Sequence, residues 1–101
     1  MHVTIRAEGA LSVAALTGSI TSENANELEA ALRNEPSGPE GMIIDAAGLE
    51  YISSAGLRVL LAAKKRCRDR AFRIINVNDA VMSVFDVTGF SEIMDISRAK
   101  R

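Results

Sequence analysis

The chain has little of the chemistry on which most enzymes and metal sites depend. Its 101 residues include one cysteine, Cys67, and one histidine, His2. A single cysteine excludes an internal disulfide, and the lack of a Cys/His cluster argues against a zinc site. Because His2 lies near the end of the sequence, a Ser/His/Asp or Cys/His catalytic group is effectively excluded. We therefore expect no metal, no cofactor and no enzymatic activity.

Aromatic residues, net charge and long apolar runs are also scarce. There is no tryptophan, one tyrosine and three phenylalanines, so a base-stacking surface is not expected. A net charge of -1 provides no field toward nucleic acid or an acidic membrane. No apolar run approaches the roughly 20 residues of a membrane span, and the first residues lack a signal-peptide apolar segment. Together with the lone cysteine, these features predict a cytoplasmic protein.

The patterns that are present predict a single α/β domain over residues 1–101. Hydrophobic residues make up 48% and charged residues 25%, the balance of a globular domain. Val3 and Ile5 alternate with polar residues, and a turn at Gly9 leads into a second strand over 11–16, so we expect a hairpin. We expect Gly18 to close the second strand.

Strand and helix patterns then alternate along the chain. A helix is expected to begin at Thr21 or Ser22, and residues 35–41 form a linker-like stretch after it. Further elements are predicted as follows: a buried strand over 41–45, a short loop, a helix over 54–68, a strand over 72–77, a helix over 80–87 capped by Asn78 or Asp79 and ending at Gly89, a short element over 93–96, and a frayed tail from Arg98. This alternation predicts helices packed on a mixed sheet.

Two adjacent serines, Ser53 and Ser54, stand where the apolar helix begins. The first turn of a helix has unpaired backbone N–H groups and the positive end of the helix dipole. A serine there either caps the helix or carries a phosphate that the helix end stabilises. Two serines allow both, with Ser53 as the cap and Ser54 as the group offered to a partner.

Three segments together resemble the STAS domain of bacterial anti-sigma factor antagonists. They are Tyr-Ile-Ser-Ser-Ala-Gly-Leu-Arg over 51–58, which follows Ile-Ile-Asp, Leu-Thr-Gly-Ser-Ile-Thr over 16–21, and Val-Phe-Asp-Val-Thr-Gly-Phe over 84–90. Their order and spacing match the family over nearly the whole chain. The resemblance implies a mixed sheet of four or five strands with helices mainly on one face.

The resemblance also implies a function in partner switching. An anti-sigma serine kinase would bind the unmodified protein, phosphorylation of Ser54 would release it, and a metal-dependent serine phosphatase would reset it. Ser53 is the second candidate for phosphorylation. The protein would be a monomer when free and would bind neither nucleic acid nor membrane. The expected partner-binding residues are Thr21, Ser53, Ser54, Ala55, Gly56, Arg58, Asp86 and Thr88.

The sequence departs from the family pattern at three positions. Ser53 and Thr21 stand where many members have carboxylates, and Ala55 stands where they have a second hydroxyl. These changes argue against nucleotide chemistry and against a third interpretation, a weak nucleoside triphosphatase. The alternative that we keep open is a structural STAS subunit of a lipid-transport ATPase or another multiprotein assembly.

Asp45 and the basic run over 64–70 each allow two interpretations. Asp45 could bind a metal or act as a base, but an aspartate after a strand commonly accepts local backbone N–H bonds. The basic run could contact nucleic acid, but it closes a helix, where cations suit the dipole, and no aromatic residue interleaves it. We therefore expect a structural role for Asp45 and a solvated face for the run.

Overall fold

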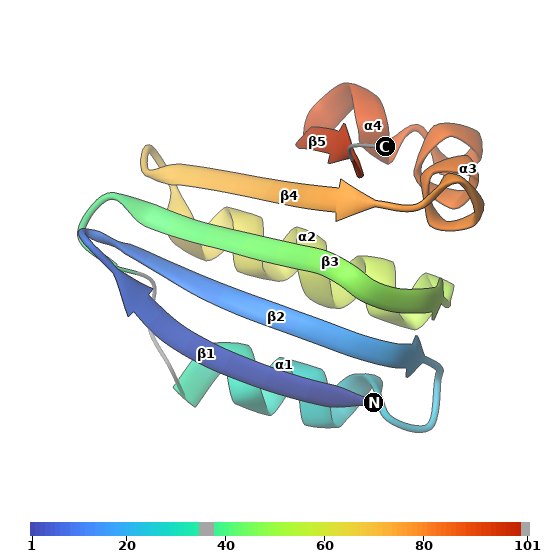
Figure 1. The fold of residues 1–101 in the computed structure, drawn as a ribbon, viewed down its shortest axis with the longest axis horizontal. Coiled ribbons are helices and arrows are strands. Elements are labelled where there is room, and N and C mark those ends of the chain that lie inside the picture. The colour runs from blue at the N-terminus through green and yellow to red at the C-terminus, as the bar shows by residue number, and fades with distance from the viewer. Residues whose placement is uncertain (35–37, 100–101) are drawn as a thin grey trace.

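The computed structural model describes residues 1–34 and 38–99 and contains one five-stranded sheet (Figure 1). The strands lie in chain order across the sheet: β1 (His2–Glu8), β2 (Leu11–Ile20), β3 (Gly41–Ile52), β4 (Ala71–Val77) and β5 (Asp95–Arg98). β1 and β2 are antiparallel, as the predicted hairpin requires, and the other neighbouring pairs are parallel. The sheet is therefore mixed, as predicted.

Helices connect the parallel strands: α1 (Ala25–Asn34), α2 (Ser54–Cys67), α3 (Asp79–Thr88) and α4 (Phe90–Ile93). Every crossover moves in the same direction across the sheet, so right-handed connections place the helices on one face. Figure 1 shows α1 and α2 behind the sheet and α3 and α4 near its β4–β5 edge. The predicted α/β architecture is confirmed. Within the described residues, no helix is long and apolar enough to cross a membrane.

The hydrophobic core lies between the sheet and the helices. Leu16, Ile44 and Ile74 come from adjacent strands, and Leu28 and Leu60 come from α1 and α2. All five side chains are at most 1% exposed. Burying such side chains is the main favourable term in folding, and it fixes the position of α2 on the sheet.

β3 is longer than predicted, and the expected loop between Asp45 and Ser53 is instead a continuation of the strand. Two extra residues in β3 shift its register against β2, one between Asp45 and Gly48 and one between Leu49 and Tyr51. Each such bulge reverses the alternation of side chains between the two faces. Leu49 and Ile52 both face the core as a result, although they are three positions apart.

The structure corrects two other predicted boundaries near β2. Gly18 lies inside the strand, where its φ of +84° falls at a register shift, and Ser19 and Ile20 still pair with β3. The prediction that Thr21 or Ser22 begins α1 is also wrong. The helix begins at Ala25, because the residues before it form a separate turn in which Asn24 Oδ1 accepts the Thr21 N–H at 2.8 Å.

The C-terminal part also differs from the prediction. The element expected over 93–96 is divided between α4 and β5. Arg98 is not frayed, because its Nη1 lies 2.7 Å from Asp79 Oδ1, and the next N–H, from Ala99, donates to the Val77 carbonyl at 2.9 Å. The rest of the expected tail, residues 100–101, lies outside the described residues, as do residues 35–37 of the linker-like stretch.

Candidate functional site

The candidate site is the start of α2, next to the ends of β2 and β3. The Ser53 N–H donates to the carbonyl of Ile20, the last residue of β2, at 2.8 Å. Ser53 itself is extended, with φ -84° and ψ 169°. This bond ties the first residues of the helix to the sheet, so the residues that follow are presented from a fixed position.

Ser53 caps α2, as predicted. Its Oγ accepts the Gly56 N–H at 3.2 Å, and its carbonyl accepts the Leu57 N–H at 3.0 Å. A serine hydroxyl in this position satisfies one of the unpaired N–H groups of the first turn. The hydroxyl of Ser53 is therefore engaged within the chain.

Ser54 is the first residue of α2, and its side chain is exposed. Its hydroxyl makes no hydrogen bond within residues 1–34 and 38–99. The first turn of α2 contains no acidic residue, and Arg58, one turn further on, is exposed and forms no ion pair with another described residue. A negative group at Ser54 would meet the positive end of the helix dipole and a free guanidinium group.

Gly56, which was expected among the partner-binding residues, does not lie on the open surface. It is buried, and an added Cβ would lie 2.7 Å from Ile20 Cγ2 and 2.8 Å from Ile52 Cγ1. The close approach of α2 to the sheet thus explains why this position has no side chain. Ala55 beside it is half-buried against the core.

Thr21 lies next to the start of α2, because Ser53 bonds to the preceding residue, Ile20. It is half-buried, and its Oγ1 accepts the Glu23 N–H at 3.2 Å. Asn24, which was not among the predicted residues, stabilises this turn, because its Nδ2 donates to the Ser19 carbonyl at 2.9 Å. An asparagine shortly before a helix is a common signal for such a role.

Asp86 and Thr88 lie on α3 and are exposed. Thr88 Oγ1 donates to the Val84 carbonyl at 2.7 Å, so its hydroxyl is used within its own helix. Because β3 and β4 are parallel, α3 begins at the same end of the sheet as α2 (Figure 1). An exposed tyrosine that the sequence analysis did not select, Tyr51, also lies at this end, close before the two serines.

Asp45 has a structural position inside β3. Its Oδ1 accepts the Ala47 N–H at 3.1 Å and the Asn76 Nδ2–H at 3.0 Å. The first bond pairs a backbone N–H at the bulge, as expected for an aspartate that accepts local N–H groups. Within the described ranges, no three His, Cys, Asp or Glu side chains are close enough to hold a metal.

A family model described as "Mlab, STAS domain" matches residues 3–95. The chain belongs to the STAS domain family. The three segments that suggested STAS all lie within the matched range, so the resemblance is confirmed. The capped start of α2, with Ser54 exposed beside it, is therefore a feature of a STAS domain.

Similar proteins support this assignment. The chain is 32% identical over 103 residues to BtrV of Bordetella bronchiseptica, provisionally named an anti-sigma factor antagonist, and the match covers 99% of this chain and 89% of BtrV. The crystal structure of an anti-sigma factor antagonist from Mycobacterium paratuberculosis is 21% identical, with a TM-score of 0.81 over 95% of this chain and 84% of that one. SpoIIAA in its unphosphorylated form is 15% identical, with a TM-score of 0.77 over 94% and 87%. At these identities the two structures show the shared fold.

Proposed function

We propose that this STAS domain is an anti-sigma factor antagonist whose partner binding is switched by phosphorylation of Ser54. The observation that carries the proposal is the division of roles between two serines. Ser53 holds the helix cap, while Ser54 is exposed and has no described partner. BtrV matches nearly the whole chain, and its name as an anti-sigma factor antagonist supports the same function. In this proposal Ser54 is modified and Ser53 is not.

The unmodified protein binds an anti-sigma serine kinase through the start of α2. Thr21, Ser54 and Arg58 form the contact surface, together with the exposed parts of Ser53 and Ala55. Asp86 and Thr88 extend it onto α3. Gly56 acts indirectly, because it lets α2 sit close to Ile20 and Ile52 and so positions the surface. ATP is the kinase's substrate, and this protein is a non-enzymatic regulator without a cofactor of its own.

Phosphorylation changes the interface and leaves the fold intact. A phosphoserine carries about -1.5 to -2 charges at neutral pH. At Ser54 this charge meets the positive end of α2, so it does not oppose the helix. In a close protein contact the same charge must lose its water, which is unfavourable without new partners. The kinase complex then dissociates, and a metal-dependent serine phosphatase restores the binding form in the cytoplasm.

The proposal is tested by the affinity of Ser54 variants for an anti-sigma serine kinase from the same genome. Ser54→Asp should weaken the complex at least tenfold, which corresponds to about 1.4 kcal/mol of binding free energy. Ser54→Asn is the matched control, because it has nearly the same shape without the charge, and it should bind within a few-fold of wild type. Equal affinity of wild type and Ser54→Asp would contradict the switch. A structural-subunit role in a lipid-transport ATPase or another assembly would then be favoured.

A further inference from the structure

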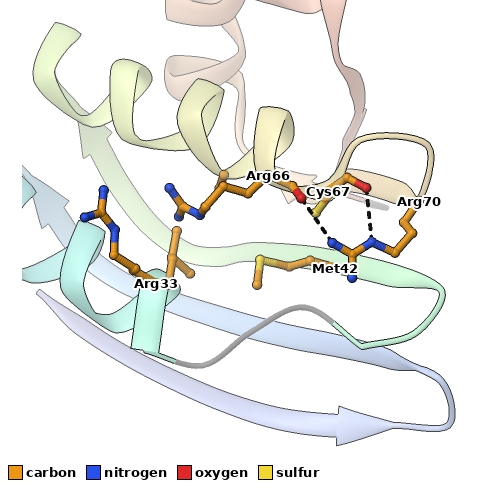
Figure 2. Close-up of a pocket in the computed structure, with 7 residues that line it drawn as sticks. Arg33, Met42, Arg66, Cys67 and Arg70 are labelled. Carbon is orange, nitrogen blue, oxygen red and sulfur yellow. Dashed lines mark hydrogen bonds between the residues drawn. The ribbon is translucent and has the colours of Figure 1, made fainter.

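A cavity of about 140 Å³ lies at the other end of α2 from Ser54, between the last turns of α1 and α2 and the start of β3 (Figure 2). Four of its side chains are buried and apolar, namely Leu32, Met42, Ala63 and Cys67. The remaining three are arginines, namely Arg33, Arg66 and Arg70. An apolar floor with a small number of polar groups is the usual character of a site for a small molecule.

Two of the three arginines, Arg33 and Arg66, share one carboxylate. Glu29 Oε1 accepts from Arg33 Nη2 at 2.7 Å and from Arg66 Nη1 at 3.3 Å. Although 36% of the Arg66 side-chain surface is exposed, its Nη2 is shielded from solvent and has no hydrogen-bond partner within the described residues. A buried guanidinium N–H without an acceptor is unfavourable and requires an explanation, such as a bound anion or water.

Unlike Arg66, Arg70 donates its hydrogen bonds to backbone carbonyls. Its Nε donates to the Cys67 carbonyl at 3.1 Å and its Nη2 to the Arg66 carbonyl at 3.0 Å, as the dashed lines in Figure 2 show. These bonds occupy carbonyls at the end of α2 and offset the negative end of its dipole. An anion in the cavity therefore does not face these two carbonyls bare. Of the Arg66 guanidinium, Nη1 is engaged by Glu29 and Nη2 remains available to the anion.

We infer that this cavity binds a small organic anion, with a carboxylate or phosphoryl group on Arg66 and an apolar part against Met42 and Ala63. Guanidinium groups favour both kinds of oxyanion, because they can donate two parallel hydrogen bonds. The volume is close to that of an engineered cavity of about 150 Å³ that binds benzene. The ligand is thus about as large as one aromatic ring with a charged substituent. The basic run over 64–70, expected to be a solvated face, supplies two of the lining arginines.

The inference is independent of the proposed switch. Ser54 is the first residue of α2 and Cys67 the last, and a helix of 14 residues is roughly 20 Å long. A ligand at Cys67 would leave the Ser54 surface open. Phosphorylation and ligand binding can therefore be tested separately, and the failure of one leaves the other standing.

The test is a titration of the ¹⁵N-labelled full chain with benzoate and with phenyl phosphate, followed by amide chemical shifts. Saturable shifts should appear at Leu32, Ala63 and Cys67, and the two probes show which oxyanion is preferred. Benzamide, the neutral analogue of benzoate, should bind at least tenfold more weakly. Arg66→Gln should weaken benzoate binding at least tenfold, whereas Arg6→Gln, an equal charge change on β1, should leave it unchanged.

Arg66→Lys separates a loss of ligand binding from a loss of folding. It keeps a positive charge near Glu29, but it cannot donate the two parallel hydrogen bonds of a guanidinium group. This variant should also bind benzoate more weakly, and its amide chemical shifts outside the cavity should match those of wild type. Equal affinity for benzamide and benzoate would show that the cavity recognises only the apolar ring and not the negative charge, and it would overturn the inference. Unchanged benzoate affinity in Arg66→Gln, or an absence of saturable shifts, would overturn it as well.

Discussion

Arg68 has a backbone conformation that is unfavourable for a residue with a side chain. It follows the last residue of α2 and has φ 54° and ψ -117°. The Arg70 N–H donates to the Cys67 carbonyl at 3.0 Å, so residues 67–70 form a tight turn with Arg68 at its first central position. These angles are those of a type II′ turn, in which glycine is strongly favoured at that position. Holding another residue there costs of order 1–3 kcal/mol.

We therefore predict that Arg68→Gly raises the free energy of unfolding by about 1 kcal/mol, because relief of strain exceeds the added flexibility of glycine in the unfolded chain. Urea unfolding at constant pH measures the effect. Arg68→Ala is the matched control, because it removes the same side chain but keeps a Cβ, and it should show no such gain. A glycine variant no more stable than wild type would show that Arg68 is not strained.

At the same scale, local signals predicted some residues and not others. The cap of Ser53 was predictable, because its acceptor role depends on a helix that begins at the next residue. The burial of Gly56 was not predictable, because it depends on Ile20, which is far away in the sequence. Asp45 falls between these cases: its local bond to Ala47 follows from the residue type, but its bond to Asn76 comes from a neighbouring strand.

At the scale of elements, α2 offers the clearest test, because its start is both the cap and the candidate site. Ser53→Ala should lower the free energy of unfolding by about 1 kcal/mol, since the Gly56 N–H loses its acceptor. Ser53→Asp should retain nearly all of the stability, because aspartate caps helices as well as serine does. Thermal unfolding of the two variants gives the comparison. Equal stability of Ser53→Ala and Ser53→Asp would contradict the capping role.

The elements also show where sequence patterns stop being informative. The hairpin, α2, β4 and α3 were predicted to within a few residues, since apolar periodicity and caps are local. The predicted β3 ended at Asp45, too early, because the rest of the strand depends on pairing with β2 and on two bulges that break the alternation of side chains. The four-residue helix α4 was missed, because it has no side-chain cap and no buried residue.

At the scale of the whole molecule, the fold and the function rest on different observations. The strands lie in chain order, so right-handed crossovers that all move in one direction place the helices in a single layer. The same architecture occurs in structures only 15–21% identical to this chain, so the architecture alone does not specify a function. The proposed function depends on the exposed Ser54 at the start of α2, while the proposed anion site depends on Arg66 near the other end.

The most direct test is intact mass and peptide mapping after incubation with an anti-sigma serine kinase and Mg-ATP, for wild type, Ser54→Ala and Ser53→Asn. Wild type and Ser53→Asn should each gain one phosphate on Ser54, because asparagine retains the cap without adding a charge to the contact surface, and Ser54→Ala should gain none. Phosphate retained in Ser54→Ala would place the modification elsewhere. A competent kinase that leaves wild type unmodified would contradict the proposed switch.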